Sequence, residues 1–207
     1  MLLLAINKIG EIMKSLDQNA LNQLFLNAHT FNKFTDQPVD DNSIKQLYEL
    51  LKWGPTAVNS QPGRYVFVKT KAAKARLAPA LQPGNAAKVE AAPVTVIVAT
   101  DSRFYEHLGS QWTAYDAAKP FVDDAALAKS AGFRNACLQG AYLILAARAI
   151  GLDCGPMSGF SNAKVDAEFF PDGRFKANFL INLGYGAENG YYPRGPRLDF
   201  SQVAEIL

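Results

Sequence analysis

The stretch WGPTAVNSQP, residues 53–62, followed after Gly63 by RYVFVKT, residues 64–70, marks a change from helix to strand. Apolar residues before it recur with helical spacing, and Gly54 with Pro55 ends this helix because neither residue continues a helix well. The alternating residues after it are typical of a half-buried strand. The stretch therefore predicts a helix, a turn and a strand in close succession.

The connecting turn is polar but carries no charge. A proline at each end fixes φ, so that the donors and acceptors between them are held in place. These groups are the hydroxyls and amides of Thr56, Asn59, Ser60 and Gln61. Such a turn suits recognition of a flat, neutral, hydrogen-bonding group. The alternative is an ordinary turn, since these residue types commonly bond to their own backbone.

The composition is that of one globular domain spanning residues 1–207. Hydrophobic residues make up 49% of the chain and charged residues 19%, with a formal net charge of +2. Lys and Arg form no dense stripe, which disfavours binding of nucleic acid. One short basic run, at Lys69, Lys71, Lys74 and Arg76, is expected to be the solvated start of a helix.

The two cysteines, Cys137 and Cys154, form no CxxC pair and indicate no disulfide framework. We expect each to pack as a small apolar residue. The opening MLLLAI is far shorter than the roughly 20 apolar residues that span a bilayer, and it lacks the features of a signal peptide. These observations favour a cytoplasmic protein that does not enter the membrane, with residues 1–17 as a helical or loosely ordered extension.

The remaining chain alternates between helical and strand patterns without repeats. Helices are predicted at 18–28, 40–53, 71–80, 123–150 and 161–169, and strands at 64–70, 93–100 and 178–184. The longest helix is rich in Ala and Gly, which predicts close approach of another helix in a core or a subunit interface. The irregular segment 101–119 carries four aromatic residues, which form either a cover over a pocket or a satellite core.

Several classes of site are disfavoured by missing patterns. The chain has no GxGxxG after a strand and no GxxxxGK[ST], so a Rossmann or P-loop nucleotide site is not expected. His29 and His107 belong to no HExxH or Cys/His cluster, and we therefore assign no metal site. GxSxG is absent, and no Ser or Cys nucleophile has an evident partner.

The order of residues in the opening turn resembles the flavin-contacting turn of the FMN-dependent nitroreductase family. The resemblance implies that Pro55, Thr56, Ala57 and Asn59 contact FMN. A second segment, LFLNAHTFNKF at 24–34, is similar to the family's first helix and its phosphate loop, which implies contacts from His29, Thr30 and Asn32. The match is imperfect because Ala28 and Asn32 stand where many members carry basic residues. The phosphate would then draw charge from His29, Lys33 or the C-terminal arginines; a plain helix end is the alternative.

The segment GLDCGPMSGF, residues 151–160, resembles the family stretch whose backbone runs along the flavin ring. The resemblance implies that Pro156, Met157, Ser158 and Gly159 line the ring, with the hydride passing through flavin N5 near the backbone of Ser158 and Gly159. No catalytic side chain is assigned. Preorganised backbone N–H groups suit the electron-rich reduced ring, and glycines at 155 and 159 would let the backbone approach it. Without the family, this segment is a helix C-cap followed by a Gly-Pro loop.

Two weaker segments complete the resemblance. GNAAKV at 84–89 stands where the family contacts the ribityl chain and pyrimidine edge, which makes Asn85 and Lys88 candidates; helix capping by Asn85 is the alternative. YYPRGPRLDF at 191–200, in a C-terminal arm at 187–207, is similar to the family's basic tail. This places Arg194 and Arg197 on the FMN phosphate, which suits the planar fork of Arg; otherwise they are surface residues.

The resemblance extends from about residue 20 to the end of the chain and is similar in detail to the malonic semialdehyde reductase branch of uracil degradation. Gly63, where many relatives carry Trp, fits this branch and widens the space the Trp would fill. The resemblance implies an α+β fold with a mainly antiparallel sheet surrounded by helices. It also implies an intertwined homodimer with FMN at the interface, in which the turn reaches the flavin held mainly by the partner.

The activity implied by the resemblance is hydride transfer from NADPH or NADH through FMN to a small electrophile, here malonic semialdehyde. Three alternatives remain open from the sequence. These are a broad nitroaromatic or quinone reductase, a flavin-binding module without turnover, and a helical structural protein whose polar turns are only turns.

Overall fold

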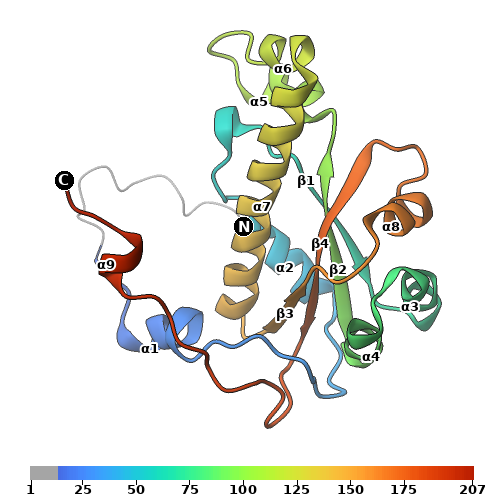
Figure 1. The fold of residues 1–207 in the computed structure, drawn as a ribbon, viewed down its shortest axis with the longest axis vertical. Helices are drawn as coiled ribbons and strands as arrows, with labels where there is room; N and C mark the ends of the chain where they lie inside the picture. Colours follow the sequence, from blue (N-terminus) through green and yellow to red (C-terminus); the bar gives the residue numbers. More distant parts are fainter. Residues whose placement is uncertain (1–13) are drawn as a thin grey trace.

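The computed structural model describes residues 14–207, which fold around one four-stranded sheet (Figure 1). The strand order is β1-β2-β4-β3, and every neighbouring pair is antiparallel. The strands are β1 Gly63–Val68, β2 Val94–Asp101, β3 Asp153–Met157 and β4 Phe175–Gly184. Helices cover both faces, which confirms the predicted α+β class with an antiparallel sheet surrounded by helices.

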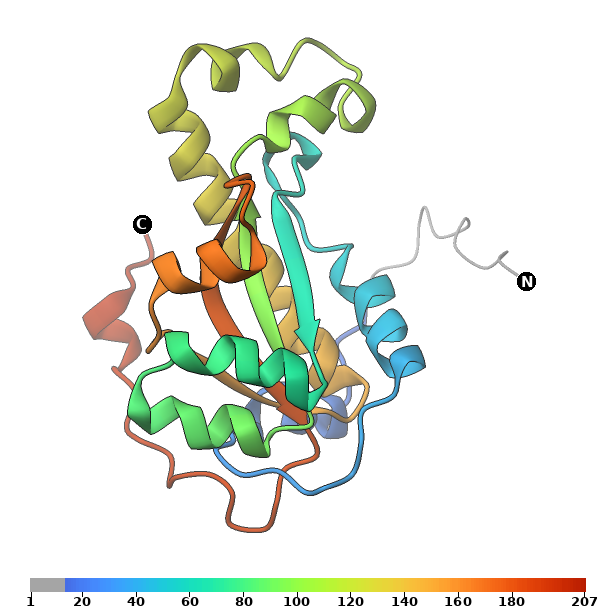
Figure 2. The ribbon, with the colours of Figure 1, turned by 90° about the vertical axis from the view of Figure 1, so that its right-hand side faces the viewer.

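The helices form two layers. Helices α2 and α7 lie on one face of the sheet, and α3, α4 and α8 lie on the other (Figure 2). Their bounds are α1 Gln18–Leu21, continued by a π-helical turn to Leu26, α2 Asp41–Leu51, α3 Lys71–Leu77, α4 Pro83–Ala91, α5 Leu108–Gln111, α6 Lys119–Asp123, α7 Ala125–Ala149, α8 Asn162–Phe169 and α9 Phe200–Val203. Single 3-10 turns lie at Ala57–Asn59, Ala78–Ala80 and Phe104–His107.

The central strand β2 explains why the core has two halves. Val96 and Val98 point to the cluster under α2 and α7, whereas Ile97 and Ala99 point to the cluster under α3, α4 and α8. A strand covered on both faces needs a nearly continuous apolar sequence. A third, smaller cluster forms around Phe104 in the segment 101–119, so this segment packs as a satellite core.

Helix α7 is capped at its N-terminus by Asp124, whose side chain accepts hydrogen bonds of 2.9 Å from the N–H groups of Ala126 and Leu127. Its glycines face the sheet. A Cβ on Gly132 would lie 3.1 Å from Thr100, and one on Gly140 would overlap Phe179. The small residues therefore let the sheet approach the helix, and the expectation that they admit another helix is wrong at these two positions.

The eight predicted elements are confirmed with shifted ends, whereas the strand β3 and the helices α4, α5, α6 and α9 were not predicted. Residues 153–157 form the edge strand β3 instead of a loop, and residues 83–91 form α4. Pro156 hides the strand pattern but is tolerated because only an edge strand can lack an N–H partner. The expectation that the basic run at 69–76 is solvated is also wrong at Lys74. The ammonium of Lys74 is buried and donates to the carbonyls of Glu90 and Ala92.

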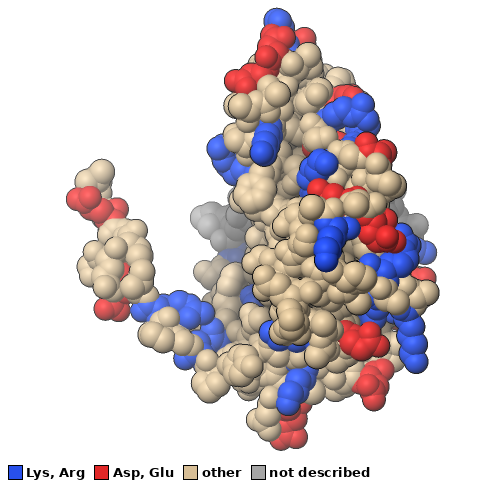
Figure 3. Space-filling model, turned by 45° about the vertical axis from the view of Figure 1, so that its right-hand side comes forward, with Lys and Arg blue, Asp and Glu red and all other residues tan. Residues whose placement is uncertain are grey.

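The cysteines are free, and burial raises the pKa of the Cys154 thiol to about 12. Within residues 14–207, no helix is both long and apolar enough to cross a bilayer. The expectations for residues 1–13 fall outside the described part of the chain. Figure 3 shows Lys and Arg scattered over the face it draws, with a group on the C-terminal arm that stands away from the body.

Candidate cofactor site

The N-terminal loop and the C-terminal arm meet in a pocket of about 470 Å³. Its walls carry three arginines, two of them predicted, together with three polar residues of the N-terminal loop. The lining residues are Phe25, Ala28, His29, Thr30, Asn32, Arg148, Tyr192, Pro193, Arg194, Gly195 and Arg197. The pocket thus brings together five predicted candidates from two segments that are more than 150 residues apart in the sequence. Lys33 does not line it.

The N-terminal loop is held against the edge strand and the arm by backbone pairing. Thr30 forms a parallel bridge with Cys154 of β3, and the Phe31 N–H donates to the Cys154 carbonyl at 2.9 Å. The Asn32 N–H donates to the Gly190 carbonyl at 2.7 Å. The His29 ring stacks on Tyr191 with 4.0 Å between centroids. The loop is therefore ordered by contacts with two distant segments, which a single helix end would not provide.

Each pocket arginine is anchored by backbone carbonyls. Arg194 Nη2 donates to the carbonyls of Leu26 and Ala28 at 2.7 and 2.9 Å, and Arg148 Nη1 donates to the Leu24 carbonyl at 2.8 Å. Arg197 Nη1 donates to two carbonyls of its own arm. A guanidinium has five N–H donors, so each keeps free donors for an anion.

Arg148 is a candidate site residue that the sequence patterns did not indicate. It lies in the last turn of α7, where a basic residue is ordinary because it complements the helix dipole. Only the fold brings it beside Ala28, the position where basic residues were expected. The positive charge missing from the loop is thereby supplied by the end of a helix 120 residues later in the chain.

The edge strand β3 leads from this pocket to the second group of candidates. Cys154 bonds the loop, and Ser158 lies four residues further, about 13 Å along an extended chain. There Asn85 Nδ2 donates to the Gly159 carbonyl at 3.0 Å, and the Gln82 N–H donates to the same carbonyl at 3.1 Å. These hydrogen bonds join the start of helix α4 to the backbone just beyond the end of β3.

Gly155 of β3 and Gly159, two residues beyond its end, each lie against another group of the protein. A Cβ on Gly155 would overlap the Phe31 carbonyl, and one on Gly159 would lie 2.5 Å from Asn85 Nδ2. Their missing side chains admit the N-terminal loop and the side chain of Asn85. The backbone at positions 155 and 159 is therefore packed closely against other parts of the same chain.

The other candidates of this edge differ in exposure. Pro156 and Ser158 are exposed, whereas Met157 is half-buried and packs against the cluster under α3, α4 and α8. Lys88 is half-buried, and its carbonyl accepts from Asn182 Nδ2 at 3.0 Å. Ser158 is thus accessible at the point where the strand ends.

The polar turn has a strained backbone. Val58, Asn59 and Gln61 have φ values of 48°, 52° and 41°. Positive φ is rare for residues other than glycine and is least expected for β-branched Val58, so surrounding contacts must impose it. Asn135 Oδ1 accepts from the Ala57 N–H at 2.8 Å, and Asn59 Nδ2 donates to the Gln111 carbonyl at 3.2 Å. The strain marks this turn as a candidate site, beyond an ordinary connection.

Within one chain the turn is separated from the arginine pocket. The turn contacts Asn135 of α7, whereas Arg148, 13 positions further along the same helix and thus about 20 Å away, lines the pocket. In Figure 1 the turn lies near α5, and α1 lies at the opposite end of α7. The exposed Pro55 and Asn59 therefore face solvent away from the other candidates.

A buried carboxylate anchors the segment that follows β2. Asp101 is fully buried and pairs with Arg64 at 2.8 Å and with Arg174 at 3.0 Å. Burial alone would raise the pKa of Asp101, but the hydrogen bonds from Arg174 and the Arg103 N–H, with the charge of Arg64, outweigh burial and hold that pKa below its usual value. The ion pairs join β1, β2 and the start of β4.

The model of the nitroreductase family matches residues 27–185, more than half of the chain. The chain belongs to the nitroreductase family. It is 55% identical over 194 residues to a protein of Burkholderia lata, covering 94% of this chain and all of that protein, and 56% identical over 192 residues to one of Xanthomonas oryzae, covering 93% and 98%. Both are provisionally named NADH dehydrogenase/NAD(P)H nitroreductase.

A solved nitroreductase of Exiguobacterium sibiricum, in complex with FMN, has the same fold. The two superpose with a TM-score of 0.82 at 20% sequence identity, covering 94% of this chain and 99% of the other. Among residues 14–207 of this nitroreductase family member, no cluster of three or more His, Cys, Asp or Glu has the arrangement of a metal site.

Proposed function

We propose that this chain binds FMN and passes reducing equivalents from NADPH or NADH to a small electrophile, with residues 1–207 acting as one domain. The observation that carries the proposal is the convergence of three arginines, His29 and Thr30 in one pocket at the start of β3. Family membership and the provisional names of relatives above 50% identity support a nicotinamide donor.

The arginine pocket fits a phosphate monoester. Arg148, Arg194 and Arg197 keep free N–H donors, and Thr30 adds a hydroxyl, while the lining includes no Asp or Glu among the described residues. Phosphate oxygens bind well to guanidinium groups because the planar fork can donate two parallel hydrogen bonds. We assign the FMN phosphate to this pocket, with His29 and Asn32 at its rim.

The exposed edge from Pro156 to Gly159 fits the ring of FMN. Ser158 is accessible at the strand end, and Asn85 lies beside it. Bound FMN would supply hydride transfer between the nicotinamide and the acceptor. The protein's part is to fix the ring against this backbone, with Asn85 and Lys88 at its polar edge and with Met157 packed beneath the strand.

The polar turn would complete the site from a second copy of the chain. Because it lies about 20 Å from Arg148 along α7, we assign it to a cofactor held by the partner chain. Large apolar side chains are exposed on α7 and beside α2, including Phe133, Leu138 and Trp53. Exposed apolar groups of this size indicate an interface. A homodimer would cover them and bring Pro55, Thr56, Ala57 and Asn59 to the partner's FMN.

For the acceptor we propose malonic semialdehyde, reduced to 3-hydroxypropionate. The support is the extended sequence resemblance of residues 133–160 and of the turn, together with Gly63 in place of Trp. The second candidate is reduction of nitroaromatics or quinones, which the names of the relatives favour. Both share the same cofactor chemistry and differ only in the acceptor.

The test is anaerobic reduction of the purified yellow protein with NADPH and with NADH, followed by mixing with each acceptor. Bleaching of the flavin by a nicotinamide and fastest reoxidation by malonic semialdehyde are expected. Equal reoxidation by a nitroaromatic and a quinone would favour the second candidate. Protein that stays colourless after FMN is added would overturn the proposal, and bound FMN that neither nicotinamide bleaches would indicate a flavin-binding module without turnover.

A further inference from the structure

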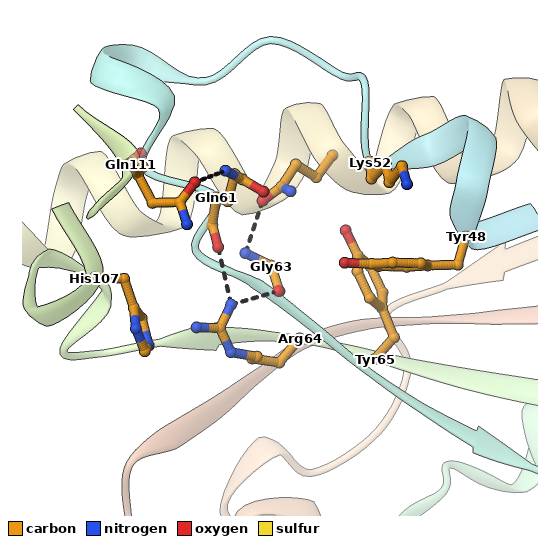
Figure 4. A pocket seen from close by; sticks show the side chains of 10 residues that line it. Tyr48, Lys52, Gln61, Gly63, Arg64, Tyr65, His107 and Gln111 are labelled. Atoms are coloured by element: carbon orange, nitrogen blue, oxygen red, sulfur yellow. Dashed lines mark hydrogen bonds between the residues drawn. The ribbon is translucent and has the colours of Figure 1, made fainter. Parts of the chain in front are cut away.

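A second, smaller pocket of about 170 Å³ lies behind the polar turn, between α2, β1 and α7 (Figure 4). Gly63 is part of its wall, and a Cβ there would lie 2.6 Å from the Tyr65 hydroxyl and 2.8 Å from Gln139 Oε1. The absence of a side chain at 63 thus keeps the pocket open. This space admits several water molecules or a molecule of a few carbon atoms.

Two buried hydroxyl groups at this pocket have no hydrogen-bond partner within the described chain. These are Ser60 Oγ, on a residue only 3% exposed, and Tyr65 Oη. A buried polar group without a partner costs about 1–3 kcal/mol, so such groups are expected to meet a ligand or an ordered water. Tyr48, Tyr65 and Lys52 line the same pocket and are labelled in Figure 4.

The pocket offers hydrogen-bond donors, whereas its acceptors are already used. Gln139 Oε1 accepts from the Gly63 N–H at 2.7 Å, and because an N–H can only donate, the Gln139 atom there must be oxygen and its NH₂ group faces elsewhere. The carbonyls of Gln61 and Gly63 both accept from Arg64 at 2.9 Å. The remaining groups are the two unpartnered hydroxyls, which can donate to a ligand that accepts.

The charge of the pocket points the same way. Lys52 and Arg64 line it together with His107, and the described residues contribute no carboxylate to the lining. Arg64 is neutralised by Asp101 behind the wall, and Lys52 pairs with Glu49 on the outer surface. An anion would therefore meet no repulsive side chain in the pocket.

The geometry points to a binding site for a small carboxylate at this place, held by Ser60 Oγ and Tyr65 Oη. The site goes beyond the proposed function, because it lies behind the turn and uses none of the residues assigned to FMN. An occupant would bridge the turn, through Ser60, to β1, through Tyr65. It would thereby hold the turn in its strained conformation.

Isothermal titration of the FMN-loaded protein tests the proposal with propionate as the probe and propionamide as its neutral isostere. Propionate is expected to bind at least about tenfold more tightly, since a hydrogen bond to a charged group is stronger by about that factor. Ser60→Ala and Tyr65→Phe should each weaken propionate binding about tenfold without loss of flavin absorbance. The matched control is Tyr115→Phe, at an exposed tyrosine outside the pocket.

Both pocket variants only remove a hydroxyl that has no partner, so they should fold like the parent. Titration with no heat from propionate, or equal affinity for propionate and propionamide, would overturn the site and leave it as a water-filled cavity. Unchanged binding in both pocket variants would do the same. Because flavin absorbance and reduction are read separately, failure of this site is distinguishable from failure of the proposed function.

Discussion

Arg148→Gln tests the assignment of the phosphate pocket most directly, because this residue entered the site only through the fold. Arg148 keeps its Leu24 carbonyl contact with Nη1 and has free donors on the remainder of the guanidinium. Loss of a hydrogen bond between charged groups costs about 1.5–3 kcal/mol. FMN binding should therefore weaken by about 10-fold to 150-fold, since each 1.4 kcal/mol is a factor of ten.

The assay compares FMN with riboflavin, which has the same ring and ribityl chain but no phosphate. Dissociation constants are measured for both by quenching of flavin fluorescence on titration of apoprotein. Arg148→Gln should weaken FMN binding and leave riboflavin binding within about twofold, so that the preference for FMN falls by the whole factor. Arg76→Gln is the matched control, because Arg76 lies on α3 with Glu168 as its partner, away from the pocket.

Two results would refute the reasoning. An unchanged affinity for FMN would show that Arg148 supplies no charge to the phosphate. Equal loss for FMN and riboflavin would show that the substitution damages the fold of the loop through its Leu24 contact, and not the phosphate site.

Three further variants address the fold around the site. Gly155→Ala should lower stability by about 1–3 kcal/mol through overlap with the Phe31 carbonyl, whereas Gly109→Ala, which meets open space, should not change the Tm. Asp101→Asn should cost about 2 kcal/mol at pH 7, less than a fully buried pair because its arginines are partly exposed. Since the folded pKa of Asp101 is depressed, that stability is fully present above the unfolded pKa of about 4 and is lost as pH falls through the lower, folded pKa. The difference in unfolding free energy between parent and variant should therefore shrink between pH 7 and pH 3, and a constant difference would contradict this. Phe133→Glu should convert the proposed dimer to monomer in sedimentation and release FMN; a dimer of unchanged affinity would place the interface elsewhere.

Local sequence signals predicted the elements whose patterns are complete within themselves. Helix α7 and strand β2 have long apolar patterns with clear ends, and the structure has both within a few residues of the prediction. Strand β3 escaped because a short segment with Gly and Pro at 155 and 156 has no strand pattern of its own. It becomes a strand only because β4, paired with it from Asp153 to Met157, supplies the partner.

The residue types already specify the chemistry that is available: a polar uncharged turn at 53–62, a basic C-terminal arm and a Gly-Pro segment at 151–160. The tertiary structure alone decided which of these meet. It brought Arg148 to the loop beside Ala28, buried Lys74, and separated the turn from the pocket by about 20 Å along α7. The reason is physical: propensity and periodicity act over a few residues, whereas a binding pocket is assembled by contacts between segments more than a hundred residues apart.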